Sequence, residues 1–186
     1  MCCSSPSLFV CLTKGASSKN LRRFDYMRKR KINFEDAKIC IPTSSGGHLT
    51  HMVLLKDFWS EHDRFWVTFD KMDAQSILRD ERKYWCYYPT NRNIWNLIRN
   101  TFLALKILKK EKPDIIISSG AAIAIPFFFL GKLFFRCKCI YVEVFDRIDK
   151  STIAGKFCYR FADEFFVQWE EQLKVYPKAK FIGYIF

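Results

Sequence analysis

One stretch decides the fold of this chain: residues 38–50 read KICIPTSSGGHLT. A short apolar run is followed directly by hydroxyl residues and two glycines, and then by a segment with helical periodicity. This order is typical of a buried strand, a tight turn and a helix, which form the first unit of a parallel sheet. The sequence therefore predicts an α/β fold whose first strand covers residues 38–42.

The alternation of short apolar runs with longer helical patterns continues through the rest of the sequence. Because each strand is followed by a helix, right-handed crossovers would build a Rossmann-like, doubly wound parallel sheet. We expect one domain over residues 38–186, since this length suits one sizeable core. The expected strands are 38–42, 64–69, 84–87, 115–118, 138–143, 164–168 and 180–182, and the expected helices are 48–59, 72–79, 94–110, 121–135 and 152–162.

Charge and hydropathy limit the kinds of partner. The 31 Lys and Arg against 19 Asp and Glu give a net charge of +12, which favours an anionic partner such as nucleic acid, an acidic membrane or a phosphorylated substrate. No apolar run reaches the ~18 to 20 residues that span a bilayer. The nearest, residues 121–135, is broken by Pro126, Gly131 and Lys132. We therefore expect a protein on the cytoplasmic side whose membrane contact is peripheral.

The first 37 residues differ in composition from the rest. They are rich in serine and then basic, ending in the run Arg28-Lys29-Arg30-Lys31. We interpret residues 1–37 as a poorly ordered extension. Met27, just ahead of the basic run, is a second candidate for the natural start.

The cysteines do not form a metal-binding pattern. There are eight, mostly single residues in apolar segments, and no two CxxC pairs occur at zinc-ligand spacing. Free thiols in a reducing compartment are the simpler interpretation, and we expect neither a metal nor a cofactor.

The loop after the first strand has the chemistry of a diphosphate cradle. Glycines ahead of a helix leave backbone N–H groups and the positive helix end open to an anion. His48 would lie in the first helical turn, where the dipole keeps the ring neutral and able to act as a general base. The alternatives are a plain tight turn and a solvated histidine. The proposed anion-binding residues here are Ser44, Ser45, Gly46 and Gly47.

Two later loops should reach the same edge of the sheet, because the carboxyl ends of parallel strands lie together. Ser119 and Gly120 follow the fourth strand and are further candidates for diphosphate binding. Glu143 ends the fifth strand and is either a second catalytic candidate aimed into the cleft or half-buried against Arg147.

The helix expected over residues 94–110 carries an unusually wide apolar face with basic residues beside it. Such a face suits partial insertion at an anionic membrane interface. The alternative is an ordinary core helix with a wet basic side. The residues expected to contact the membrane are Trp95, Ile98, Arg99, Phe102 and Lys106.

Four motifs carry a family resemblance: PTSSGGHL at 42–49, IISSGA at 116–121, YVEVFDR at 141–147 and FFVQWEEQ at 165–172. With them the chain resembles the PssD-type polysaccharide biosynthesis proteins of bacteria. It is similarly close to the membrane-anchor subunit of the eukaryotic dolichol-linked N-acetylglucosamine transferase. Two features depart from the relatives that this resemblance brings in. The eukaryotic subunit has an N-terminal transmembrane helix, whereas residues 1–37 here are polar and basic, and the loop at 119–122 has fewer glycines than the corresponding loop of the lipid-linked N-acetylglucosamine transferase of peptidoglycan synthesis.

The resemblance implies that the chain is the N-terminal, acceptor-side half of a GT-B glycosyltransferase. In that family the Gly-Gly-His loop faces the acceptor diphosphate, and a separate donor-domain partner binds the UDP-sugar. The implied activity is transfer of a sugar such as GlcNAc or Gal onto a lipid-diphosphate-linked saccharide in capsular or exopolysaccharide synthesis. The chain alone would be inactive and would lie on the cytoplasmic face of the membrane.

Three other functions remain open from the sequence. The chain could be a non-catalytic membrane scaffold for the same partner. It could be an NAD-binding Rossmann protein, since Asp70 follows the second strand, but the third glycine of GxGxxG is missing. The third is a nucleic-acid-binding module. Because the excess positive charge of this chain is dispersed along the sequence and no known nucleic-acid-binding motif occurs, we expect no nucleic acid partner.

Overall fold

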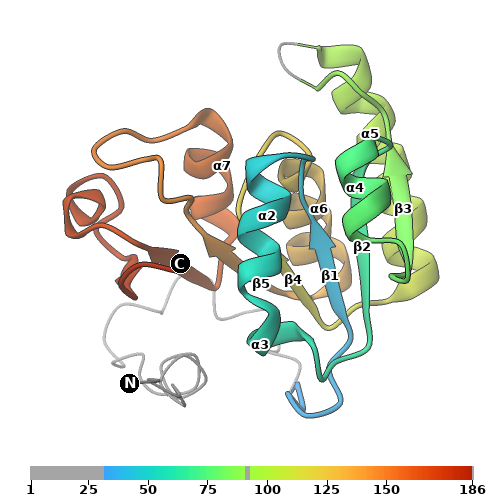
Figure 1. Cartoon of the computed structure of the whole chain (residues 1–186), viewed down its shortest axis with the longest axis horizontal. Coiled ribbons are helices and arrows are strands. Elements are labelled where there is room, and N and C mark those ends of the chain that lie inside the picture. The colour runs from blue at the N-terminus through green and yellow to red at the C-terminus, as the bar shows by residue number, and fades with distance from the viewer. Residues whose placement is uncertain (1–31, 91–92, 186) are drawn as a thin grey trace.

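The computed structural model describes residues 32–90 and 93–185 (Figure 1). Residues 1–31, which include most of the expected extension and the candidate start Met27, lie outside the described residues. The last part of that extension, from Ile32 to Ala37, contains a turn. Ile32 and Phe34 pack against the hydrophobic core, so the core extends several residues ahead of the first strand.

A single seven-stranded sheet forms the centre of the protein, and every neighbouring pair of strands is parallel. The strand order is β3-β2-β1-β4-β5-β6-β7. The chain therefore builds outward from β1 in one direction, returns to β4 and builds outward in the other, which confirms the doubly wound α/β fold. The strands are β1 Ile39–Pro42, β2 Arg64–Phe69, β3 Lys83–Cys86, β4 Ile115–Ser118, β5 Lys138–Val142, β6 Glu164–Val167 and β7 Lys180–Phe181.

Helices cover both faces of the sheet, and two separate hydrophobic clusters form where they pack. One face carries α2 Gly47–Leu54, α3 Lys56–Trp59 and α4 Met72–Ile77. The other carries α5 Ile94–Glu111, α6 Ala124–Leu130, the π-helix η1 Gly131–Phe135 and α7 Ile153–Phe161. A 3₁₀ turn, η2 Glu170–Lys174, precedes β7. None of the helices in the described part of the chain is long and apolar enough to cross a membrane.

Two helices that the sequence predicts as continuous are interrupted. The helix expected over 48–59 ends at Leu54, because Leu55 leaves the helical region (φ −86°, ψ 22°) and α3 begins after it. The helix expected over 121–135 begins only at Ala124 and continues as η1 from Gly131. Pro126 is tolerated because it lies in the first turn, where its missing N–H has no helical partner.

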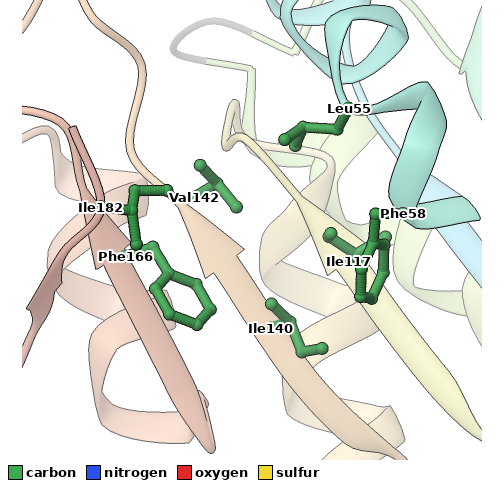
Figure 2. Close-up of a pocket in the computed structure, with 7 residues that line it drawn as sticks. All are labelled: Leu55, Phe58, Ile117, Ile140, Val142, Phe166 and Ile182. Atoms are coloured by element: carbon green, nitrogen blue, oxygen red, sulfur yellow. The ribbon is translucent and has the colours of Figure 1, made fainter. Parts of the chain in front are cut away.

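An apolar hollow lies between α2, α3 and the strands β4, β5 and β6 (Figure 2). Its lining contains no hydrogen-bonding side chain, so it does not suit the hydroxyl or phosphate groups of a sugar diphosphate. Polar loops occur instead at the carboxyl ends of β1, β4 and β5. The residues lining the hollow are Leu55, Phe58, Ile117, Ile140, Val142, Phe166 and Ile182.

Candidate functional site

The candidate site lies at the point where the sheet changes direction, at the carboxyl ends of β1 and β4. We call residues 43–47 the β1 loop and residues 118–121 the β4 loop. The two strands are neighbours in the sheet, and their loops are in direct contact through His48 and Ser119. A crevice at such a switch point is where ligands bind in doubly wound folds.

The β1 loop turns the chain into α2 with its glycines open to solvent. Gly46, the residue ahead of the helix, has φ 82°, which a residue with a side chain rarely adopts. A Cβ built on Gly46 or Gly47 would meet no atom within 4 Å. Gly47 is therefore not required by packing, and the space beside it is available to a ligand. Ser44 and Ser45 lie half-buried on the same loop.

Asp73, a residue that sequence reasoning did not single out, already occupies part of this cradle. Its Oδ2 atom accepts a hydrogen bond from Gly46 N at 2.6 Å, from the first turn of α4. No spacing rule predicts this contact, because Asp73 belongs to a different strand-helix unit. A diphosphate in the cradle would have to bind beside or displace this carboxylate.

The ring of His48 is held between the two loops. Its Nδ1 atom lies 3.1 Å from Ser119 O and 3.3 Å from Ser119 Oγ. Burial lowers the pKa of His48 below its ordinary value, although the hydrogen bond to Ser119 opposes this effect. The sequence predicts a neutral ring from the helix dipole, and the structure gives desolvation as the main cause.

The β4 loop is tied to the β1 strand by its own hydroxyls. Ser118 Oγ donates to Pro42 O at 2.6 Å and accepts from Gly120 N at 3.0 Å. Gly120 has φ 116°, and a Cβ at this position would lie 2.5 Å from the hydroxyl of Tyr141. Glycine is required here by both backbone conformation and space, so the predicted residues Ser119 and Gly120 do reach the site.

Glu143 has buried hydrogen-bond partners that the sequence did not indicate. It is fully buried, its Oε2 accepts from the Tyr176 hydroxyl at 3.0 Å, and its Oε1 accepts from Val144 N at 3.3 Å. Arg147, the alternative partner, has its guanidinium 3.7 Å from Asp146 on the surface, and the described residues contain no ion pair between Arg147 and Glu143. Burial raises the pKa of Glu143 to about 7. Whether it takes part in chemistry stays a prediction.

The buried carboxyl of Glu143 gives stability a specific pH dependence. Its folded pKa is raised above the ordinary 4.5, so ionisation opposes folding increasingly above pH 4.5 and fully above about pH 7, by about 3 kcal/mol. We expect Glu143→Gln to raise the melting temperature by several degrees at pH 8.5 and to change it little at pH 4.5. Glu171→Gln, which removes the same charge from an exposed position, is the control. Equal shifts for the two variants at pH 8.5 would contradict the assignment.

A second polar cluster lies beneath α2. Gln168 Nε2 lies 2.6 Å from His51 Nε2 and donates to Glu143 O at 2.9 Å, while its Oε1 accepts from Ile185 N. Burial lowers the pKa of His51 to about 4, so His51 is neutral and accepts from the amide. These hydrogen bonds connect α2, which also carries His48, to the end of β5 and to the segment after β7.

Helix α5 packs Ala104, Ile107 and Leu108 into the core, but near its start it buries polar side chains and exposes apolar ones. Asn96 and Asn100 are buried, since Asn96 donates to Pro89 O and Asn100 bonds both backbone groups of Tyr87. The side chains of Trp95 and Phe102 are 78% and 69% exposed. The wide apolar face is therefore divided between a part that packs in the core and an exposed stripe, and contact of that stripe with a membrane stays a prediction. The α5 surface comprises Ile94, Trp95, Ile98, Phe102 and Leu105.

Basic side chains border the α5 surface. Lys106 is exposed, and the guanidinium of Arg99 lies over the Tyr87 ring at 4.0 Å. The π-helix η1, which contacts α5, adds the exposed Leu133 and Phe134. All five residues predicted for membrane contact are thus exposed on one helix.

The fold is a Rossmann-like α/β domain that matches one half of a GT-B protein. The structure superimposes on MurG of Acinetobacter baumannii with a TM-score of 0.58 over 72% of this chain, at 14% identity. At that identity the likeness shows the fold alone. The match covers 42% of the MurG chain, so this chain spans less than half of the length of that protein.

Sequence comparison then gives the family. The profile described as "Oligosaccharide biosynthesis protein Alg14 like" matches residues 88–185, which is more than half of the chain, and the chain therefore belongs to the Alg14-like family. It is 25% identical to the human UDP-N-acetylglucosamine transferase subunit ALG14, over 81% of this chain and 84% of that protein. It is 28% identical to the Yarrowia lipolytica subunit of the same name, over 97% and 81%. These homologues confirm the predicted enzyme class, a glycosyltransferase subunit.

Proposed function

We propose that this chain is the acceptor-side subunit of a two-protein glycosyltransferase that moves GlcNAc from UDP-GlcNAc to a lipid-diphosphate-linked acceptor. The observation that carries the proposal is the contact between His48 and Ser119 at the switch point of a single GT-B half. Membership of the Alg14-like family and the names of its relatives support the donor and the subunit role. The donor-binding half is a separate partner protein.

The site chemistry fits an acceptor with a diphosphate group. The N–H groups of Gly47 and His48 have no partner within their own helix, by helix geometry, and a Cβ built on Gly47 would meet no atom within 4 Å. In the proposed reaction the neutral His48 takes the proton from the acceptor hydroxyl. The hydroxyl oxygen then bonds to the sugar carbon, and UDP leaves with the bonding electrons. Glu143 supports the loop after β5 in this scheme and does not touch the substrate.

Acceptor binding by the isolated chain tests this assignment. We expect a solubilised lipid-diphosphate-GlcNAc to bind more tightly than UDP-GlcNAc, measured by calorimetry in the same detergent. Asp73→Asn should tighten acceptor binding roughly five-fold, because it removes about 1 kcal/mol of repulsion from the cradle. Tighter binding of UDP-GlcNAc than of the acceptor would show that this is the donor half.

The lipid carrier separates two biological settings of the same reaction. The first setting, which the sequence resemblance implies, is a PssD-type role in capsular or exopolysaccharide synthesis, where the acceptor saccharide is attached to a bacterial lipid. The alternative is the dolichol-linked acceptor that the resemblance to the eukaryotic subunit implies, and the relatives named above are eukaryotic. Paired binding measurements with undecaprenyl- and dolichyl-diphosphate saccharides decide between them, and preference for dolichol would remove the capsular role.

We further propose that the subunit binds the membrane peripherally through the α5 surface. Its outward apolar side chains can enter the headgroup region, and each nearby basic residue adds about 1 kcal/mol on an anionic bilayer. We expect flotation with vesicles containing anionic lipid and much less with neutral vesicles. Phe102→Glu should lower partitioning at least about ten-fold, because it removes apolar contact and adds a negative charge.

A matched control exists on the opposite face of the sheet. Met72 begins α4 and is 86% exposed, so Met72→Glu makes a comparable apolar-to-acidic change outside the α5 surface. It should leave flotation unchanged. If both variants lose binding equally, general charge and not the α5 surface governs the interaction.

A further inference from the structure

The hydrogen bonds around the His48 ring treat its two nitrogens differently. Nδ1 faces Ser119, with Ser119 O at 3.1 Å and Ser119 Oγ at 3.3 Å. Within residues 32–90 and 93–185 no group forms a hydrogen bond with Nε2, and this atom is not one of the buried polar atoms that lack a partner. Nε2 is therefore accessible to a ligand, whereas Nδ1 is held by the protein.

The chemistry of the partners determines which nitrogen carries the hydrogen. A backbone carbonyl only accepts, so Nδ1 must donate to Ser119 O. The Ser119 hydroxyl does not reverse this polarity, because its one hydrogen is donated to His48 O at 3.1 Å. A ring with hydrogen on Nε2 would set the Nδ1 lone pair against two oxygen acceptors. The neutral ring is therefore the Nδ1–H tautomer, with its lone pair on Nε2.

We propose that Ser119 is a positioning residue for His48. Its carbonyl selects the tautomer, its hydroxyl fixes the backbone of the same histidine, and together they present Nε2 as the proton-accepting atom. This inference rests on the proposed transferase function and deepens it, since it names the acting atom and the residue that prepares it. It is independent of the membrane and carrier proposals.

The surroundings of the ring support this role for Ser119. Ser119 is fully buried, so its two hydrogen-bonding groups do not compete with bulk water. The β4 loop also packs directly against the ring, because a Cβ at Gly120 would be in van der Waals contact with His48 Cε1 at 3.4 Å. The titratable or charged groups that act on the ring come from two elements: His51 on α2, and Asp146 and Arg147 in the loop after β5.

Nitrogen-15 NMR of the full-length chain reports the tautomer directly. The protein has three histidines and a mass of 22.1 kDa, so ring signals labelled with ¹⁵N can be assigned by comparison with His48→Gln. Above the pKa we expect His48 Nδ1 to show a protonated nitrogen and Nε2 an unprotonated one. The reverse pattern in the wild-type chain would overturn the proposal without any variant having to fold.

Ser118 provides a matched control within the same loop. Ser118 and Ser119 are both fully buried, and each donates one hydroxyl hydrogen to a carbonyl of the β1–α2 region. Only Ser119 contacts the histidine. Ser119→Ala keeps the carbonyl but loses the hydroxyl bond that fixes the histidine backbone against it. We therefore expect the ring to leave the carbonyl part of the time and a mixture of tautomers to form, whereas Ser118→Ala should keep the wild-type pattern, whatever its effect on stability. The same spectrum for wild type and Ser119→Ala would remove the hydroxyl from the proposal.

Kinetics of the assembled complex complete the test. Ser119→Ala should lower kcat roughly 5- to 20-fold with little change in acceptor KM, because ground-state binding does not depend on the tautomer. The acid limb of the pH–rate profile should move toward the ordinary histidine value, since the ring becomes better solvated. An unchanged profile with reduced kcat would indicate a merely structural role. Full activity in His48→Ala would instead refute the base assignment, even if NMR confirms the tautomer.

Discussion

Replacing His48 with Ala lowers kcat of the assembled transferase by roughly 10²- to 10⁴-fold, the contribution expected of a general base. The ring is neutral because burial lowers its pKa, and its Nε2 is unoccupied. Folding should be retained, because the ring is only half-buried and Ser119 Oγ bonds the histidine backbone, which the substitution keeps. Steady-state rates with and without the partner protein measure the loss of kcat, and a melting curve checks that the variant is folded.

His48→Gln separates a base from a hydrogen-bond donor. A glutamine amide can still donate to Ser119 or to a bound diphosphate, but it does not accept a proton. If His48 only binds the acceptor, the glutamine variant keeps most of kcat and mainly raises the acceptor KM. If His48 is the base, both variants lose kcat together. Near-normal kcat and KM in His48→Ala would leave the chain as a non-catalytic scaffold.

The isolated chain should transfer no sugar above background, and activity should appear only when a donor-domain partner is added. The chain corresponds to one GT-B half, covering 42% of the MurG chain that it resembles. One Rossmann-like half binds ligands at a single edge of its sheet and does not enclose both substrates. The expected change on mixing is from no measurable product to steady turnover.

The assay for partner dependence uses radiolabelled UDP-GlcNAc and extraction of the lipid product. The His48→Ala chain mixed with the same partner serves as control, since it should still form the complex while losing turnover. Steady product formation by the chain alone, repeated after removal of contaminants by a second purification step, would show that this subunit holds a complete active site.

Much of the fold follows from the sequence because parallel strands buried on both faces appear as short apolar runs. Each predicted strand is present, within one or two residues of its expected ends. The interruptions at Leu55 and Gly131 were not predictable from periodicity. A helix of one turn after a break, and a π-helix, keep the same apolar spacing as a continuous helix over such short lengths.

The site was only partly predictable, because its contacts join residues far apart in the sequence. The motifs indicate that His48 and Ser119 both follow buried strands, but their hydrogen bond depends on β1 lying beside β4. Asp73 reaches Gly46 from another strand-helix unit and has no local signal. The inward side of α5 was also unpredictable, since Asn96 and Asn100 are buried to satisfy backbone groups of the segment before the helix.

The place of β1 and β4 at the centre of the sheet has a consequence for how the protein folds. Ser118 and Pro42, which join these strands at their carboxyl ends, are 76 residues apart in the chain. The central pair therefore closes a long loop before its contacts stabilise the sheet, which slows folding. Until β4 emerges from the ribosome, β1 has one of its two edges unpaired. The candidate site, which needs both strands, should therefore form only after this closure, and the unpaired edge of β1 should be an early target for chaperones.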